Sequence, residues 1–164
     1  MNKLLLFSVA CLLVSCSQTN SKIAKLQNEV DSLKRELSET YKPGFGEFMS
    51  SIQSHHAKLW FAGQNENWNL ADFEIHEIIE AVDNIKKYET ERKESSQIGM
   101  ITPALDSVNV AIQYRNLTSF RNSYSNLTNT CNLCHQAVNF EFNIVRIPES
   151  QFFSNQDFKI PAPK

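Results

Sequence analysis

Hydrophobic and polar residues follow three different patterns along the chain. Residues 4–14 are almost entirely apolar. From Ile23 to Leu37, apolar residues recur at alternating steps of three and four, which is the a/d spacing of a coiled coil. Beyond Pro43, apolar residues recur at helical spacing as far as Val138 and then alternate with polar residues. The pattern predicts an all-α chain.

The first two helices of the main region are defined by their apolar faces and by flanking polar or glycine residues. We expect one helix from about Gly44 to Ala62, with Gly63 placed to end it. A second helix is expected from Leu70 to Tyr88, with Asn69 as its N-cap. Residues 90–101 are charged and then polar, which predicts mostly loop.

A third and a fourth helix complete the predicted domain. Pro103 suits the first turn of a helix, and the apolar stripe that follows reaches Ile112. The next apolar residue of the pattern, Leu117, comes after a step of five that breaks helical phase, so the two helices should meet near Asn116. We therefore predict an antiparallel four-helix bundle over residues 44–138, followed by a partly extended tail over residues 139–164.

Composition agrees with one globular domain and appendages. The chain has 164 residues, of which 41% are hydrophobic, with four Gly and five Pro. These values exclude collagen-like, low-complexity and wholly disordered chains. A formal charge of −2 produces no strong field of one sign and gives no indication of nucleic-acid binding.

The N-terminus has the layout of an export signal. Residues 1–15 combine Lys3 with an apolar run that is too short to span a bilayer. The ending Leu13-Val14-Ser15-Cys16 resembles the bacterial lipobox, which implies lipidation of Cys16 and a tether over residues 16–22. The protein should then be anchored to the inner or outer membrane of a bacterial envelope, with its domain in the periplasm. An ordinary cleaved signal is the alternative.

The heptad segment over residues 23–40 is a candidate spacer and dimerisation element. With Ile23 at an a position, Glu29 falls at g and Lys34 at the following e, which makes an attractive interchain pair. Fewer than three heptads are marginal for an isolated coiled coil. The alternative is a single helix that packs on the domain.

The motif Cys131-Asn132-Leu133-Cys134-His135 carries the chemistry. A C-x-x-C-H run is the attachment signature of c-type haem. Thiols at i and i+3 lie on one helix face and can add to the two vinyl groups of a porphyrin, while His135 reaches the iron from the same side. Export agrees with this interpretation, because c-type haem is attached outside the bacterial cytoplasm. The sequence thus predicts one covalent haem c.

Three other uses of the two cysteines compete with haem. A zinc site needs further ligands, but no second C-x-x-C exists and the other histidines are His55, His56 and His76. A thioredoxin-like dithiol normally opens a helix within a βαβ unit, whereas this pair lies late in a predicted helix. A structural disulfide between Cys131 and Cys134 would close almost no loop.

A helical bundle followed by C-x-x-C-H near the C-terminus resembles the class II c-type cytochromes, the cytochrome c-prime group. The resemblance covers about residues 44–138, and its specific part is the motif itself. It implies thioether links at Cys131 and Cys134, a proximal ligand at His135, and a role in electron transfer or in binding small gases. The 29 residues after His135 depart from the family pattern, in which the chain usually stops soon after the motif.

The sixth iron ligand should come from the first helix of the bundle. His56 falls nearest to the buried face, at about 40° from its centre, and His55 lies about 60° away on the other side. Met49 is also within reach of that face, and a hydrogen-bonded core role for His56 or an open site are alternatives. Cations considered for the haem propionates are Lys58, Arg121 and Arg146.

The sequence thus points to a lipid-anchored monohaem cytochrome that transfers one electron to or from a redox partner protein in the periplasm or envelope. No pattern of paired acid and base groups indicates an enzyme. Two alternatives remain. One is a gas-binding or gas-sensing haem module with an open sixth site, and the other is a haem-free structural lipoprotein.

Overall fold

A computed structural model describes residues 20–37, 40 and 43–160 of the chain. The predicted signal peptide and the lipidation site Cys16 lie outside the described residues, as does most of the tether. Residues up to Lys42 and from Pro43 onward form two separate units. Regular secondary structure in the described ranges is entirely helical, which confirms the predicted all-α class.

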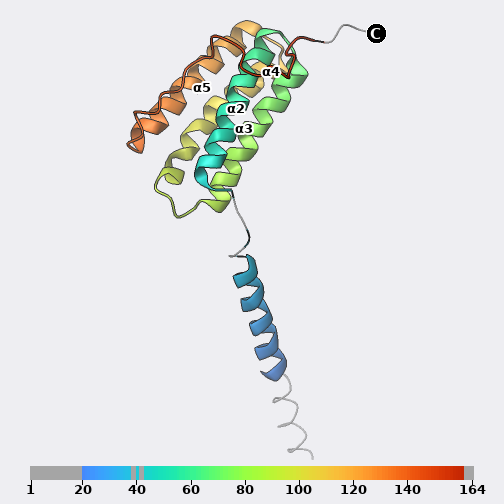
Figure 1. Ribbon diagram of the computed structural model, residues 1–164, viewed down its shortest axis with the longest axis vertical. Coiled ribbons are helices and arrows are strands. Elements are labelled where there is room, and N and C mark those ends of the chain that lie inside the picture. Colours follow the sequence, from blue (N-terminus) through green and yellow to red (C-terminus); the bar gives the residue numbers. More distant parts are fainter. Residues whose placement is uncertain (1–19, 38–39, 41–42, 161–164) are drawn as a thin grey trace, which may run out of the picture. The chain divides into compact units, whose positions relative to one another are not determined.

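Four α-helices and one 3-10 helix build the domain that begins at Pro43 (Figure 1). In chain order they are α2 (Phe45–Gln64), α3 (Trp68–Tyr88), η1 (Glu94–Ile101), α4 (Thr102–Gln113) and α5 (Leu117–Ala137). Helix α2 packs against α3, α3 packs against α4, and α4 packs against α5. α5 also contacts α2 and η1, so these elements share one hydrophobic core.

The end of α2 differs from the sequence prediction. Gly63 does not end the helix, which continues to Gln64 and is followed by Asn65 as C-cap. The left-handed residue of this turn is Glu66, with φ of 54°. Gly63 is needed for a different reason: a Cβ atom built on it would lie 2.2 Å from two atoms of the Phe120 ring. The glycine therefore lets α5 approach α2 closely.

Gly63→Ala should lower the free energy of unfolding by about 1–3 kcal/mol through overpacking, an effect that the better helix propensity of alanine offsets by about 1 kcal/mol. The Phe120 ring is fully buried and has little room to yield. Gly46→Ala is the matched control in the same helix, because a Cβ there meets nothing within 4 Å. Urea unfolding of both variants measures the effect, and equal stabilities would contradict this account of Gly63.

Between α2 and α4, the structure differs from the prediction at two further points. Asn67, not Asn69, caps α3, and its side chain accepts a hydrogen bond from the Leu70 amide at 3.3 Å. Much of the expected loop over residues 90–101 is the 3-10 helix η1. Ile98 and Ile101 in η1 are buried, so these two side chains hold the segment on the core despite its polar composition.

The predicted break between the last two helices is confirmed. α4 ends at Gln113, and Arg115 adopts a left-handed conformation with φ of 51°. The Asn116 side chain then accepts a hydrogen bond from the Ser119 amide at 2.9 Å and caps α5. The break in helical phase had marked this position without any glycine or proline.

The residues after α5 form turns and irregular structure as far as residue 160, and this tail runs back along α5 (Figure 1). Phe158 anchors it, because its side chain is buried beside Phe61 and Phe153. The side-chain Nδ2 of Asn67 also donates a hydrogen bond to the Phe158 carbonyl at 3.3 Å. The tail is therefore part of the packed domain.

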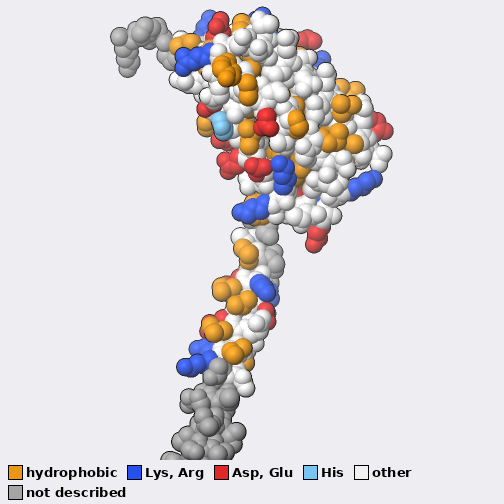
Figure 2. Space-filling model, turned by 180° about the vertical axis from the view of Figure 1, so that it is seen from behind, with side chains coloured by type: hydrophobic (Ala, Val, Ile, Leu, Met, Phe, Trp, Pro, Cys, Tyr) orange, Lys and Arg blue, Asp and Glu red, His pale blue; other side chains and the backbone are white. Residues whose placement is uncertain are grey.

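Residues 20–37 form a separate helix. Its a and d side chains are all exposed, from 42% at Val30 to 63% at Leu33 and Leu37. Figure 2 shows these hydrophobic side chains along the helix between charged ones. Among the described residues, no helix is both long and apolar enough to cross a membrane.

Candidate functional site

The last two turns of α5 bring Cys131, Cys134 and His135 to one cavity of about 470 Å³. Side chains from α2, η1, α5 and the tail line it. The apolar residues of the lining are Phe45, Met49, Ile52, Ile98, Ile101, Val138, Phe140, Ile144 and Val145. Both cysteines and the histidine of the C-x-x-C-H motif thus face the same largely apolar cavity.

The two cysteines are free thiols at the wall of the cavity. Cys134 is buried, and its sulfur lies 3.7 Å from the Gln97 carbonyl oxygen. Burial raises the pKa of Cys131 to about 12 and also raises the pKa of Cys134. Both thiols are therefore protonated at neutral pH. A redox dithiol of the thioredoxin type depends on the opposite shift, so this geometry does not favour that alternative.

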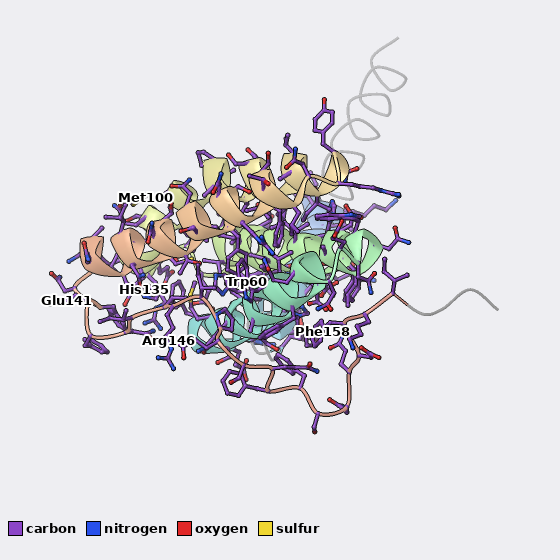
Figure 3. All side chains as sticks on the ribbon, turned by 90° about the horizontal axis from the view of Figure 1, so that it is seen from above. Trp60, Met100, His135, Glu141, Arg146 and Phe158 are labelled. Atoms are coloured by element: carbon purple, nitrogen blue, oxygen red, sulfur yellow. The ribbon has the colours of Figure 1, made fainter. Side chains whose placement is uncertain are left out.

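His135 is oriented by the tail. Its Nδ1 lies 2.6 Å from the carbonyl oxygen of Asn143, which can only accept a hydrogen bond. In the neutral imidazole Nδ1 therefore carries the proton, and Nε2 keeps the lone pair that a metal ligand needs. Figure 3 shows His135 between α5 and the returning tail, with Glu141 at the outer side of the loop.

His56 faces the cavity from α2 but already has two hydrogen-bond partners. Its Nε2 lies 3.0 Å from the Thr128 hydroxyl, and its Nδ1 lies 2.9 Å from the Tyr124 hydroxyl. The Tyr124 hydroxyl donates its single proton to the His56 carbonyl oxygen at 2.7 Å, so Nδ1–H donates to the Tyr124 oxygen. Nε2 then faces the Thr128 hydroxyl, which can donate either to it or to the Tyr124 carbonyl. Both ring nitrogens of His56 are therefore in contact with hydroxyl groups.

The His56 network lies in the core of the domain. His56 is 4% exposed, and its ring stacks on the ring of Tyr124 with 4.6 Å between centroids. Burial lowers the pKa of His56 to about 4 and raises the pKa of Tyr124. Both side chains are therefore uncharged at neutral pH. The structure places His56 in the hydrogen-bonded core role that the sequence left as an alternative.

The remaining histidines and Met49 point in different directions. Met49 lines the cavity and is half-buried. His55 is directed toward α3, where its Nδ1 lies 2.6 Å from the Glu74 carboxylate, and it does not line the cavity. His76 is exposed and hydrogen-bonds to the Asp72 carbonyl. Of the predicted ligand candidates, Met49 and His56 are thus the two beside the motif.

The cation at the cavity is Arg92, which the sequence analysis missed. Arg92 pairs with Glu94 at 3.3 Å, and its guanidinium lies 5.1 Å from the centre of the Phe45 ring. The cations considered from the sequence do not line the cavity: Arg121 bonds to Gln64, and Lys58 lies over Phe153. Arg92 precedes η1, whose buried isoleucines fix its position. That 3-10 helix was not predicted.

Over the described part of the chain, no three His, Cys, Asp or Glu side chains converge in a way that would hold a metal ion. The zinc alternative therefore gains no ligand set from the fold. Compared with protein-family models, with curated proteins and with solved structures, the chain shows no match.

Proposed function

We propose that the protein is a monohaem c-type cytochrome, with haem c linked to Cys131 and Cys134 and with His135 as the proximal ligand. The observation that carries the proposal is the shared cavity: both thiols and the imidazole reach it from the end of one helix. Haem iron supplies one-electron redox chemistry. The protein would supply the attachment points, an oriented imidazole and a largely apolar lining, which influences the potential.

The residues around the cavity fit this group. A volume of about 470 Å³ lies within the range of cofactor sites, roughly 300–1,000 Å³. The lining is mostly apolar, as a porphyrin face requires. Arg92 is the cation that a propionate would meet there, and it would have to be shared with its present partner Glu94. We further propose that α2 to α5 form the antiparallel four-helix bundle of the class II cytochromes. The three-residue connections between α2 and α3 and between α4 and α5 support that arrangement.

The distal side favours Met49 over His56 as the sixth ligand. Met49 lines the cavity with a thioether, which is a soft ligand for haem iron. His56 would have to break its hydrogen bonds to Thr128 and Tyr124 before it could bind. Two protein ligands, His135 and Met49, would suit one-electron transfer to a redox partner in the periplasm or envelope.

A gas-binding haem module is the second candidate. It is favoured by the same hydrogen bonds, which leave no imidazole nitrogen free on the distal side. If the Met49 sulfur did not bind, the cavity would leave room for a small gas among apolar side chains such as Ile52.

Visible spectra with and without carbon monoxide distinguish the two candidates. The wild-type protein should be low-spin and unaffected by carbon monoxide, whereas Met49→Leu, which keeps the apolar volume, should become high-spin and bind the gas. His56→Gln should retain the wild-type spectrum. A wild-type protein that is high-spin and binds carbon monoxide would instead establish the gas-binding module.

We also propose that Cys16 carries the lipid anchor and that the helix over residues 20–37 dimerises in the envelope. Its heptads place β-branched Ile23 and Val30 at a positions and leucines at d positions, a combination that favours parallel two-stranded coils. All these side chains are exposed. Anchoring two chains in one membrane raises their local concentration, which compensates for the short coil.

Cysteine cross-linking in the membrane fraction tests the dimer. Leu26→Cys, at a d position, should give a disulfide-linked dimer on a non-reducing gel because paired d residues face each other. Asn28→Cys lies at the outer f position and should remain monomeric. Equal cross-linking at both positions, or none at Leu26→Cys, would contradict the dimer.

A further inference from the structure

The chain reverses direction directly after the C-x-x-C-H motif. The Phe140 amide donates to the carbonyl of His135 at 2.8 Å, and Asn139 adopts a left-handed conformation with φ of 64°. This turn sends residues 141–147 back beside the last turns of α5. The returning segment contributes Asn143, Ile144 and Val145 to the cavity wall.

The Asn132 side chain holds the returning segment by two hydrogen bonds to the backbone of Val145. Its Nδ2 donates to the Val145 carbonyl at 2.9 Å, and its Oδ1 accepts from the Val145 amide at 2.8 Å. The asparagine amide thereby acts like the peptide group of a neighbouring strand, with one donor and one acceptor side by side. Aspartate lacks the donor, and alanine lacks both groups.

The clamped residue lies two positions from the carbonyl that orients the imidazole. Val145 is held by Asn132, and the Asn143 carbonyl accepts the hydrogen bond from His135 Nδ1 at 2.6 Å. The segment between them is too short to move independently of the clamp. Asn132 and His135 are three residues apart on α5, so one helix turn holds both ends of this contact.

We propose that Asn132 is a positioning residue for the iron ligand His135. By fixing Val145, Asn132 holds the Asn143 carbonyl against Nδ1, which keeps the proton on Nδ1 and leaves the lone pair of Nε2 available to a metal. The hydrogen bond also makes the imidazole a stronger donor and stabilises the ferric state. This role rests on the proposed haem attachment. It assigns a function to a position that the C-x-x-C-H motif leaves open.

The reduction potential tests the proposal on the haem-loaded protein. Asn132→Ala should retain covalent haem, since both thiols remain, but its potential should rise because the released carbonyl no longer strengthens the imidazole. The iron–imidazole stretching band of the ferrous, five-coordinate form, generated in a Met49→Leu background, should move to lower frequency. Asn132→Asp keeps the acceptor for the Val145 amide, so its stretching band should lie between those of alanine and the wild type, while its added negative charge lowers the potential independently.

Asn129→Ala is the matched control, because Asn129 is exposed on the same helix. If Asn132→Ala has the same potential and the same stretching band as Asn129→Ala, and Asn132→Asp has that stretching band too, Asn132 is not a positioning residue. Should Asn132→Ala fail to fold, Asn132→Asp decides alone by the stretching band. A wild-type protein that takes up no haem would overturn the proposed function itself, which haem content shows before any potential is measured.

Discussion

Replacing both Cys131 and Cys134 with alanine should abolish covalent haem completely. Both thiols line the cavity, and the described domain contains no other cysteine that could substitute for them. The double variant should also be less stable, because it loses the stabilisation that bound haem gives to the folded state. Either single variant should retain one thioether link. Haem-stained denaturing gels and thermal unfolding measure the two effects.

Leu133→Ala provides the control between the two cysteines. Leu133 is 53% exposed, so its truncation should leave haem content and melting temperature close to those of the wild type. If the double cysteine variant were colourless but folded as stably as the wild type, and the wild type were colourless too, the haem-free structural lipoprotein would be the better account.

Acidification from pH 6.5 to pH 4 should destabilise the protein through His56. In the folded protein burial holds the pKa of this imidazole at about 4, below its ordinary value of 6.5. The unfolded chain therefore binds a proton first as the pH falls. The stability that comes from keeping His56 neutral is fully present above pH 6.5. It is lost as the pH falls toward 4, which lowers the free energy of unfolding by about 3 kcal/mol in all.

His56→Gln isolates this effect, since glutamine can bond to Tyr124 and Thr128 but does not titrate. The difference in unfolding free energy between wild type and His56→Gln should shrink between pH 7 and pH 4, as the wild type loses its advantage. His76→Gln, at an exposed position, serves as the control. A wild-type advantage that is constant over this pH range would show that His56 is not the buried neutral imidazole described above.

Local sequence signals were sufficient for much of the helical layout. The break at Asn116 follows from a step of five between Ile112 and Leu117, because an α-helix cannot keep both residues on one face. The burial of His56 followed from the same angular reasoning. Such signals are sufficient where the burial of a residue depends only on its angular position around its own helix.

Features that depend on residues far apart in sequence were missed. Gly63 resembled a helix end but serves the approach of Phe120, 57 positions later. Arg92 reaches the cavity because Ile98 and Ile101 are buried in a segment whose composition suggested loop. The roles of these residues depend on packing between distant segments, which the spacing of residues along the chain does not reveal.

The candidate site shows the same division. The roles of Cys131, Cys134 and His135 were predicted from spacing, and the fold adds the cavity that they share. The clamp between Asn132 and Val145 spans 13 residues and a reversal of the chain, so the motif alone gave no sign of it. The alternating pattern of the tail predicted an extended segment but not its contact with α5.

The intact mass of the exported protein tests the central claim most directly. The chain should be produced from its own signal with a haem-attachment system, purified, and extracted with acidified acetone to remove non-covalent haem. We predict a mass increase of one haem per chain that survives extraction and is absent from the variant lacking Cys131 and Cys134. A mass equal to that of the polypeptide and its lipid alone, with no haem, would contradict the account.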